Sequence, residues 1–216
     1  MTSGATLTPG LVLHAYGQGV FPMSESRDDP DVFWVDPERR GIIPLDGFHI
    51  SRSLARTIRR GGFSVTFDRA FAAVMQGCAD RAETWISPTI HQVYGALHAA
   101  GHAHSVEVWS GDGQLIGGSY GVALGGAWFG ESMFSRRADA SKLALAWLVD
   151  RLRAGGFALF DTQFLTPHLA SLGAVEIPRP DFRRRLHAAL ALPARFPQAN
   201  PVPSGQALLQ RSTQTS

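Results

Sequence analysis

Two carboxylates and one amide lie where this sequence could most readily carry out chemistry. Glu131 stands in an otherwise apolar segment, 130–135, which we expect to be a turn, and Asp161 and Gln163 end a short apolar run. Residues two apart on a strand point to the same face, so Asp161 and Gln163 should share one. Burying a carboxylate without a partner is costly. We therefore predict a site at Glu131, Asp161 and Gln163; the alternative is that Asp161 merely caps the next turn.

Apolar side chains surround these polar groups in the sequence and predict the wall of a pocket. Such a wall beside acidic groups suits chemistry on an apolar group that lies next to a charged one. A purely structural role in the core remains open, above all for the leucines, which form a stripe at helical spacing. The predicted wall consists of Trp128, Phe129, Met133, Phe134, Leu145, Leu148 and Leu152.

A basic helix is expected from Ser51 to Arg60. Its arginines recur at i, i+4, i+7 and i+8, so they share one helix face; they are Arg52, Arg56, Arg59 and Arg60. No acidic residue interrupts them. This arrangement favours contact with phosphates, although a solvated helix face is the simpler alternative.

Other motifs do not support competing chemistries. His98, His102 and His104 lack acidic or cysteine partners at ligand spacing, so no metal is expected. Ser132 is not followed by the glycine of a nucleophile elbow. The glycines of segment 117–126 lack the lysine of a phosphate-binding loop.

Composition describes an ordinary globular chain. It has 216 residues, of which 44% are hydrophobic and 18% charged, and a formal net charge of +2. One cysteine, Cys78, cannot form an intramolecular disulfide. The sequence shows neither the order of a signal peptide nor an apolar stretch long enough for a membrane span. We expect a cytoplasmic monomer.

The elements that must position these residues follow from periodicity and from capping and turn residues. A domain boundary is expected at Gly61-Gly62, and a mobile tail from Pro193. Asp68 should cap one helix, and Asp139 or Ser141 another. Helices are expected at 9–17, 51–60, 68–78, 88–101, 141–154, 168–173 and 182–192, and strands at 33–35, 41–43, 63–67, 104–109, 114–122, near 128–129, 157–160 and 174–177.

Long segments of the chain resemble one family, the leucyl/phenylalanyl-tRNA–protein transferases. The resemblance covers roughly residues 7–182. The motifs that carry it are GVFPM (19–23), FW (33–34) with Pro37 and Arg39, HISRSL (49–54), TWI (84–86), GHAHSVEVW (101–109), GESMFS (130–135), ASK (140–142), DTQ (161–163) and SLGA (171–174).

The resemblance implies an α+β fold, with a small N-terminal domain followed by a larger GCN5-related N-acetyltransferase-like domain. The boundary expected at Gly61 fits this division and gives domains at 1–61 and 62–192, with the expected flexible tail at 193–216. It implies transfer of leucine or phenylalanine, and possibly methionine, from aminoacyl-tRNA to proteins that begin with lysine or arginine, which marks them for degradation. No cofactor is implied. An acetyl-CoA-dependent N-acetyltransferase and a catalytically silent tRNA-binding module are the alternatives.

Some positions depart from the family's usual pattern. Thr162 replaces the usual cysteine and should point away from Asp161 and Gln163. Met23 and Val35 stand where many members have tryptophan.

Roles for the candidate residues follow from the implied reaction. Asp161 would receive or orient the attacking amine, Gln163 would hold the reacting atoms, and Glu131 would bind the donor's ammonium group. The arginine face would meet the acceptor stem of the tRNA. Trp34 and Trp85 are candidates for stacking near the terminal adenosine, and each could equally be structural.

Overall fold

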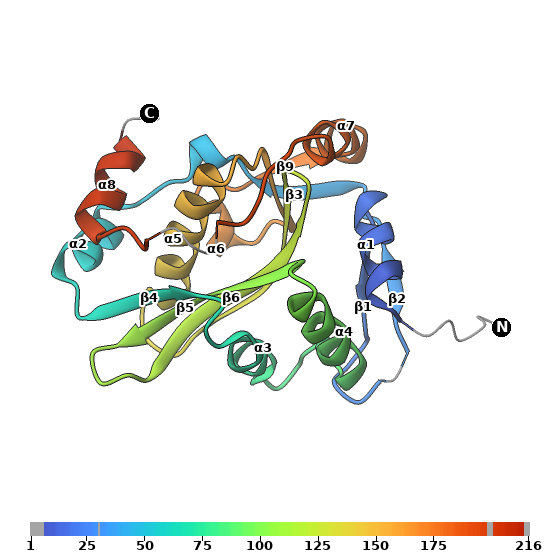
Figure 1. Ribbon diagram of the computed structural model, residues 1–216, viewed down its shortest axis with the longest axis horizontal. Coiled ribbons are helices and arrows are strands. Elements are labelled where there is room, and N and C mark those ends of the chain that lie inside the picture. Colours follow the sequence, from blue (N-terminus) through green and yellow to red (C-terminus); the bar gives the residue numbers. More distant parts are fainter. Residues whose placement is uncertain (1–6, 30, 198–200, 214–216) are drawn as a thin grey trace.

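The computed structural model describes residues 7–29, 31–197 and 201–213 (Figure 1). The parts of the expected N-terminal domain and tail at residues 1–6, 198–200 and 214–216 lie outside the described residues.

A seven-stranded mixed sheet forms the centre of the molecule, in the order β4-β5-β6-β7-β8-β3-β9. Only the β7–β8 pair is parallel among the pairs described. Two further strands, β1 and β2, form a separate antiparallel ribbon. The strands are β1 Phe21–Met23, β2 Phe33–Val35, β3 Arg39–Ile43, β4 Phe63–Phe67, β5 Ala103–Ser110, β6 Leu115–Leu124, β7 Ala127–Ser135, β8 Leu159–Gln163 and β9 Val175–Pro178.

Helices cover both faces of this sheet (Figure 1). Helices α3 and α4 lie against one face and α5 against the other, so the apolar core is divided into two clusters by the sheet. The helices are α1 Pro9–Gly17, α2 Arg52–Arg60, α3 Phe71–Ala79, α4 Pro88–Ala99, α5 Ala140–Ala154, α6 Pro167–Ala170, α7 Arg179–Leu190 and α8 Gly205–Thr213, with a 3₁₀ turn at Leu45–Gly47. The predicted mixed sheet flanked by helices is confirmed. None of the described helices is long and apolar enough to cross a bilayer.

Strands β7 and β8 separate in the middle of the sheet, and this separation creates the site. They pair over three residues only, from Ala127↔Leu159 to Phe129↔Asp161. Beyond that point β7 continues along β6, whereas β8 continues along β3. The segment 130–135 is therefore strand; the expectation of a turn there was wrong, because its polar residues Glu131 and Ser132 border a cavity.

Of the two helix caps predicted at aspartates, the position of Asp139 is confirmed and that of Asp68 is wrong. At the helix expected to begin at Ser51, the Ser51 hydroxyl accepts a hydrogen bond from the Leu54 backbone N–H. Asp68 instead contacts Nδ1 of His104, and Ala70 is the N-cap of α3. Asp139 occupies the N-cap of α5, but its carboxylate binds Lys142 rather than the helix backbone.

Two segments outside the expected central domain, β3 and α8, pack against that domain. Strand β3, from within the expected N-terminal domain, is hydrogen-bonded on both sides within the large sheet. Part of the expected flexible tail forms α8, beside α2 and α5 (Figure 1). Within this tail Leu208 is 2% exposed, and the Trp147 indole N–H donates to the Pro203 carbonyl.

Replacing Leu208 with alanine should therefore destabilise the protein by about 2–5 kcal/mol, the usual cost of truncating a buried leucine. Urea unfolding measures this change. Val202 lies in the same segment but is 40% exposed, so Val202→Ala is the control and should cost under about 0.5 kcal/mol. Equal stability of the two variants would show that α8 does not contribute to the core.

Candidate functional site

A cavity of about 400 Å³ opens where β7 and β8 separate. One wall comes from β7 and one from β8 with the segment that follows it. The rest comes from α5, α6, β6, the end of β1 and the segment before α4. It combines polar groups with apolar side chains, which suits a ligand that has both parts. The lining residues are Met23, Arg81, Trp85, Ser119, Gly130, Glu131, Ser132, Met133, Leu145, Phe160, Thr162, Gln163, Phe164, Thr166, His168 and Leu169.

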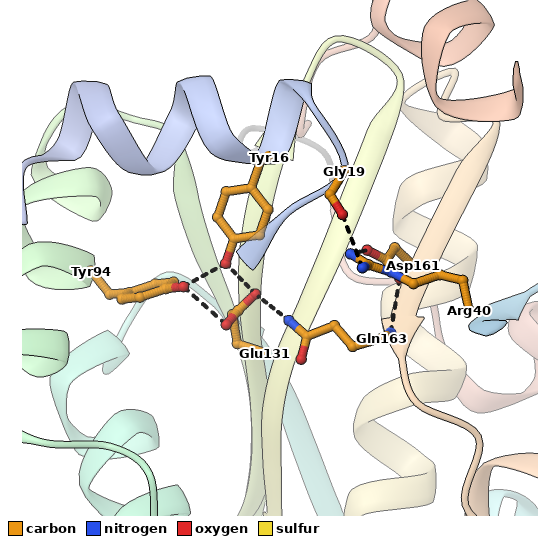
Figure 2. Close-up of polar contacts among 7 residues, drawn as sticks. All are labelled: Tyr16, Gly19, Arg40, Tyr94, Glu131, Asp161 and Gln163. Carbon is orange, nitrogen blue, oxygen red and sulfur yellow. Dashed lines mark hydrogen bonds and ion pairs between the residues drawn. The ribbon is translucent and has the colours of Figure 1, made fainter. Parts of the chain in front are cut away.

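Glu131 is the acidic group of this cavity, and three side chains hold it (Figure 2). The Tyr16 hydroxyl donates to Oε1 at 2.5 Å, and the Tyr94 hydroxyl donates to Oε2 at 3.0 Å. From the opposite side the Gln163 amide donates to Oε1 at 3.0 Å. A carboxylate has roughly four acceptor positions. One position on Oε2 therefore remains for a ligand's N–H group.

Burial raises the pKa of Glu131 to about 7, against the opposing effect of the hydrogen bonds from Tyr16 and Tyr94. The contacts of Glu131 with Tyr16 and Tyr94 explain why its carboxylate takes up a proton readily. Three oxygen–oxygen contacts join Glu131, Tyr16 and Tyr94. The ionised cluster has only two hydroxyl protons for these three contacts, and a protonated carboxyl group supplies the third.

Gln163 reaches Glu131 because the backbone twists at the end of β8. Its φ is +64°, a left-handed conformation that is uncommon for residues other than glycine. This twist breaks the alternation of side chains, so Asp161 and Gln163 do not share a face as expected. Thr162, expected to point away from them, lines the same cavity as Gln163.

Asp161 is sealed inside the protein and does not line the cavity. Its two carboxylate oxygens accept from Nε and Nη2 of Arg40, at 2.8 and 2.6 Å. Arg40 is itself 1% exposed, lies between the rings of Phe21 and Phe182, and donates to the Gly19 carbonyl. The Asp161 carboxylate also accepts from the Gln163 backbone N–H. The structure thus places Asp161 behind Gln163, as a support.

Two members of the predicted apolar wall, Met133 and Leu145, line the cavity. The other five are in the core or lie against helix α3. The Trp128 ring packs on Phe160 and Phe196, and Phe134 lies against Gly77. Phe129, Leu148 and Leu152 are fully buried.

The residues predicted for RNA contact lie in two places: the tryptophans at or near the cavity, and the arginines on the separate surface of α2. Trp85 lines the cavity, whereas Trp34 is 40% exposed on β2, in register with Pro22 beside Met23. The four arginines of α2 are all exposed. Three of them, Arg52, Arg56 and Arg59, border a groove of about 1020 Å³ between α2 and α8.

Among the site residues not identified from sequence are the three that hold Glu131 and Asp161 in place: Tyr16, Tyr94 and Arg40. Tyr16 recurs at helical spacing with apolar residues, and Tyr94 lies within an expected helix, so neither was singled out. A buried tyrosine usually needs a hydrogen-bond partner for its hydroxyl, and this was the available signal. Arg40 carried no comparable signal, because its partner Asp161 is 121 residues away.

Replacing Tyr16 or Tyr94 with phenylalanine removes a donor to the Glu131 carboxylate, so the pKa of Glu131 should rise further. A hydrogen bond to a charged group contributes about 1.5–3 kcal/mol, which corresponds to about one to two pH units. The pKa of the Glu131 carboxyl group, followed by nuclear magnetic resonance titration, should therefore move upward by this amount.

Tyr120→Phe is the matched control for these two variants. Tyr120 is also fully buried, but its hydroxyl has no hydrogen-bond partner within the described structure. Its replacement should leave the titration of Glu131 unchanged. If all three variants shift this titration equally, the hydrogen bonds to Glu131 do not control its ionisation.

Within the residues that the structure describes, no group of three or more His, Cys, Asp or Glu side chains is arranged to hold a metal ion. His104 instead binds Asp68, and the Nδ1 atom of His98 contacts the Ala103 carbonyl.

Sequence comparison identifies relatives across nearly the whole chain. The profile of a family described as leucyl/phenylalanyl-tRNA protein transferase matches residues 42–187, and the profile of its N-terminal domain matches residues 5–38. The leucyl/phenylalanyl-tRNA–protein transferase of Cereibacter sphaeroides is 66% identical over 97% of this chain and 98% of its own length. That of Ruegeria pomeroyi is 67% identical over 98% and 100%.

Comparison with solved structures concerns the fold alone. The crystal structure of FemX superimposes with a TM-score of 0.51 at 13% identity, covering 78% of this chain and 66% of FemX. This likeness supports the predicted fold, a mixed sheet flanked by helices.

Proposed function

The chain belongs to the leucyl/phenylalanyl-tRNA–protein transferase family and is an aminoacyltransferase, and we propose that it moves leucine or phenylalanine from tRNA to the N-terminal amino group of acceptor proteins. One observation above all supports this proposal: an apolar cavity that contains a single, partly unsatisfied carboxylate, Glu131. We further propose that acceptors begin with lysine or arginine and are thereby marked for degradation, that methionine is a minor donor, and that the enzyme works as a cytoplasmic monomer.

Donor recognition follows from the two kinds of surface in the cavity. The remaining acceptor position on Glu131 Oε2 suits the α-ammonium group of the donor, because charge-assisted hydrogen bonds are the stronger ones. Met133, Leu145 and Leu169 offer apolar contact to its side chain. A missing methylene costs about 1–3 kcal/mol, so Val-tRNA should be a poor donor.

The chemistry requires little activation, because an aminoacyl ester is already activated. The attacking α-amine has an ordinary pKa of about 7.7–8.0, so a useful fraction is the free base at neutral pH. Positioning then supplies much of the acceleration. This chemistry needs neither ATP nor a cofactor.

Gln163 and Asp161 have separate roles in this proposal. The Gln163 amide donates to Glu131 and lines the cavity, so it can orient the reacting groups. An amide is too weakly basic to accept the proton. Asp161 acts as a positioning residue, since its carboxylate holds the Gln163 backbone N–H at 2.8 Å from within the core.

One assay tests the function against its alternatives. Purified protein is incubated with Leu-, Phe-, Met- or Val-tRNA, or with acetyl-CoA, and with peptides that begin with arginine, lysine or alanine. We expect transfer from Leu- and Phe-tRNA onto the arginine and lysine peptides, and little from Val-tRNA. Acetyl transfer without aminoacyl transfer would establish the N-acetyltransferase instead, and tRNA binding without any transfer would establish a silent binding module.

The arginine face of α2 should bind the tRNA backbone through charge. Replacing Arg56 and Arg60 with alanine should weaken tRNA binding and reduce the slope of log affinity against log salt by about one per lost phosphate contact. The control removes two charges elsewhere, as Arg184→Ala and Arg185→Ala on α7 (Figure 1). An identical salt slope in the α2 variant and the wild type would exclude this face.

Stacking on the terminal adenosine is proposed for the two tryptophans. Trp85 is part of the cavity wall, and Trp34 is exposed on the ribbon whose other strand contributes Met23 to the same wall. Stacking of a base on an aromatic ring contributes about 1–3 kcal/mol.

A further inference from the structure

His168 contributes to the cavity wall and has not yet been given a role. It lies in the short helix α6, and its Nε2 atom is buried without a hydrogen-bond partner in the described structure. Leaving a buried polar atom unpaired costs free energy. Such an atom on the wall of a substrate cavity is explained most simply if the substrate supplies the partner.

We propose that His168 carries the proton during aminoacyl transfer, a role that rests on the function proposed above. As the acceptor amine forms its bond to the ester carbonyl carbon, Nε2 takes one proton from the attacking nitrogen. The bond between that carbon and the ribose oxygen then breaks. The imidazolium returns the proton to this oxygen, which leaves as the tRNA hydroxyl. Protons and electrons balance without a further reactant.

The other polar groups at the site are unsuited to this step. Glu131 is occupied by three hydrogen bonds and by the donor's ammonium group. Asp161 is sealed against Arg40 and has no access to the cavity. The Arg81 guanidinium has no acceptor atom, and Ser132 accepts a hydrogen bond from it. A threonine hydroxyl such as that of Thr162 is too weak a base.

The surroundings of His168 keep its imidazole neutral and ready to accept a proton. Burial lowers its pKa below 6.5, and the positive charge of Lys142 lowers it further. Glu131 and Arg81 are the other charged side chains that line the same cavity. A weak base suffices, because the attacking nitrogen becomes far more acidic once its lone pair is bonded to carbon.

Helix α6 holds the ring in place. The Thr166 hydroxyl accepts from the Leu169 backbone N–H and caps the helix, and Pro167 occupies its first turn. Leu169 is 7% exposed and belongs to the apolar core. The backbone at His168 is therefore fixed on both sides.

The test separates chemistry from binding. His168→Gln and His168→Ala are compared with wild type in single-turnover transfer from Leu-tRNA to an arginine peptide. We expect the rate at saturating donor to fall about 10²- to 10⁴-fold, with the affinity for the amide analogue of Leu-tRNA changed less than about threefold. Added imidazole should partly restore His168→Ala, which has space for it, and should not restore His168→Gln.

Several results would overturn the proposal. Full transfer by His168→Gln would exclude proton transfer by this residue, and so would a rate loss matched by an equal loss of donor affinity. His187→Gln, an exposed histidine on α7, is the control and should behave as wild type. Melting temperatures confirm folding, and should the alanine variant unfold, the glutamine variant decides. A wild-type protein that transfers nothing would contradict the proposed function itself rather than the role of His168.

Discussion

Replacing Glu131 with glutamine should remove most of the donor affinity while leaving the protein folded. The glutamine keeps the size of the side chain but loses the negative charge that would pair with the donor's ammonium group. Removing one partner of a buried charge pair costs about 2–5 kcal/mol, which is about 30-fold to about 4000-fold in affinity. Binding of the amide analogue of Leu-tRNA at pH 7.5 measures the loss.

The same substitution, Glu131→Gln, should not lower the stability of the folded protein above pH 7. The pKa of Glu131 is raised from its ordinary 4.5 to about 7, so the folded protein holds a proton that the unfolded chain has released. The stability owed to this group is therefore highest below pH 4.5 and falls as pH rises to about 7. At pH 8 the ionised carboxylate costs about 3 kcal/mol, and Glu131→Gln should melt no lower than wild type there.

Glu131→Asp serves as the second variant, because it keeps the charge but withdraws it from the tyrosines by one methylene. It should retain more donor affinity than Glu131→Gln and lose more stability. Equal donor affinity of wild type and Glu131→Gln would exclude the ammonium contact. If Glu131→Gln melts at a lower temperature than wild type at pH 8, then burial of the ionised carboxylate does not destabilise the protein, and the stated cause of the raised pKa of Glu131 is wrong.

Much of this structure could be predicted because the signals are local. The Ser51 cap, the proline of α1 and the β5–β6 hairpin each depend on residues within a few positions of one another. Glu131 and Gln163 were also predicted to share a site, because each follows an apolar run, although Glu131 lies on a strand rather than in the expected turn.

The features of the site that could not be predicted depend on contacts between residues far apart in the sequence. Tyr16 and Tyr94 reach Glu131 from 115 and 37 residues away, and no helical pattern indicates which buried tyrosine has a carboxylate partner. The predicted apolar wall failed for a related reason. Sequence shows that Trp128, Leu148 and Leu152 are buried, but only the divergence of β7 and β8 determines which buried side chains face a cavity.

Replacing Arg40 with methionine should produce the largest loss of stability, about 3–5 kcal/mol, because it leaves the Asp161 carboxylate buried and unpaired. For a chain of this size each kcal/mol lowers the melting temperature by about 2–4 °C, so a fall of about 6–20 °C is expected by calorimetry. The neighbouring Arg39 provides the matched control. Its side chain is 57% exposed in its ion pair with Glu176, so Arg39→Met should lower the melting temperature by under about 4 °C.

Arg40 should affect the site as well as stability, because it joins the two segments that hold Glu131. Its guanidinium binds the Gly19 carbonyl just after the helix of Tyr16, and the Asp161 carboxylate just before Gln163 (Figure 2). The double variant Arg40→Met, Asp161→Asn removes the unpaired charge and should recover part of the melting temperature. It should not recover transfer, since neither Tyr16 nor Gln163 regains its support. Recovery of both together would show that Arg40 stabilises the fold without positioning the site.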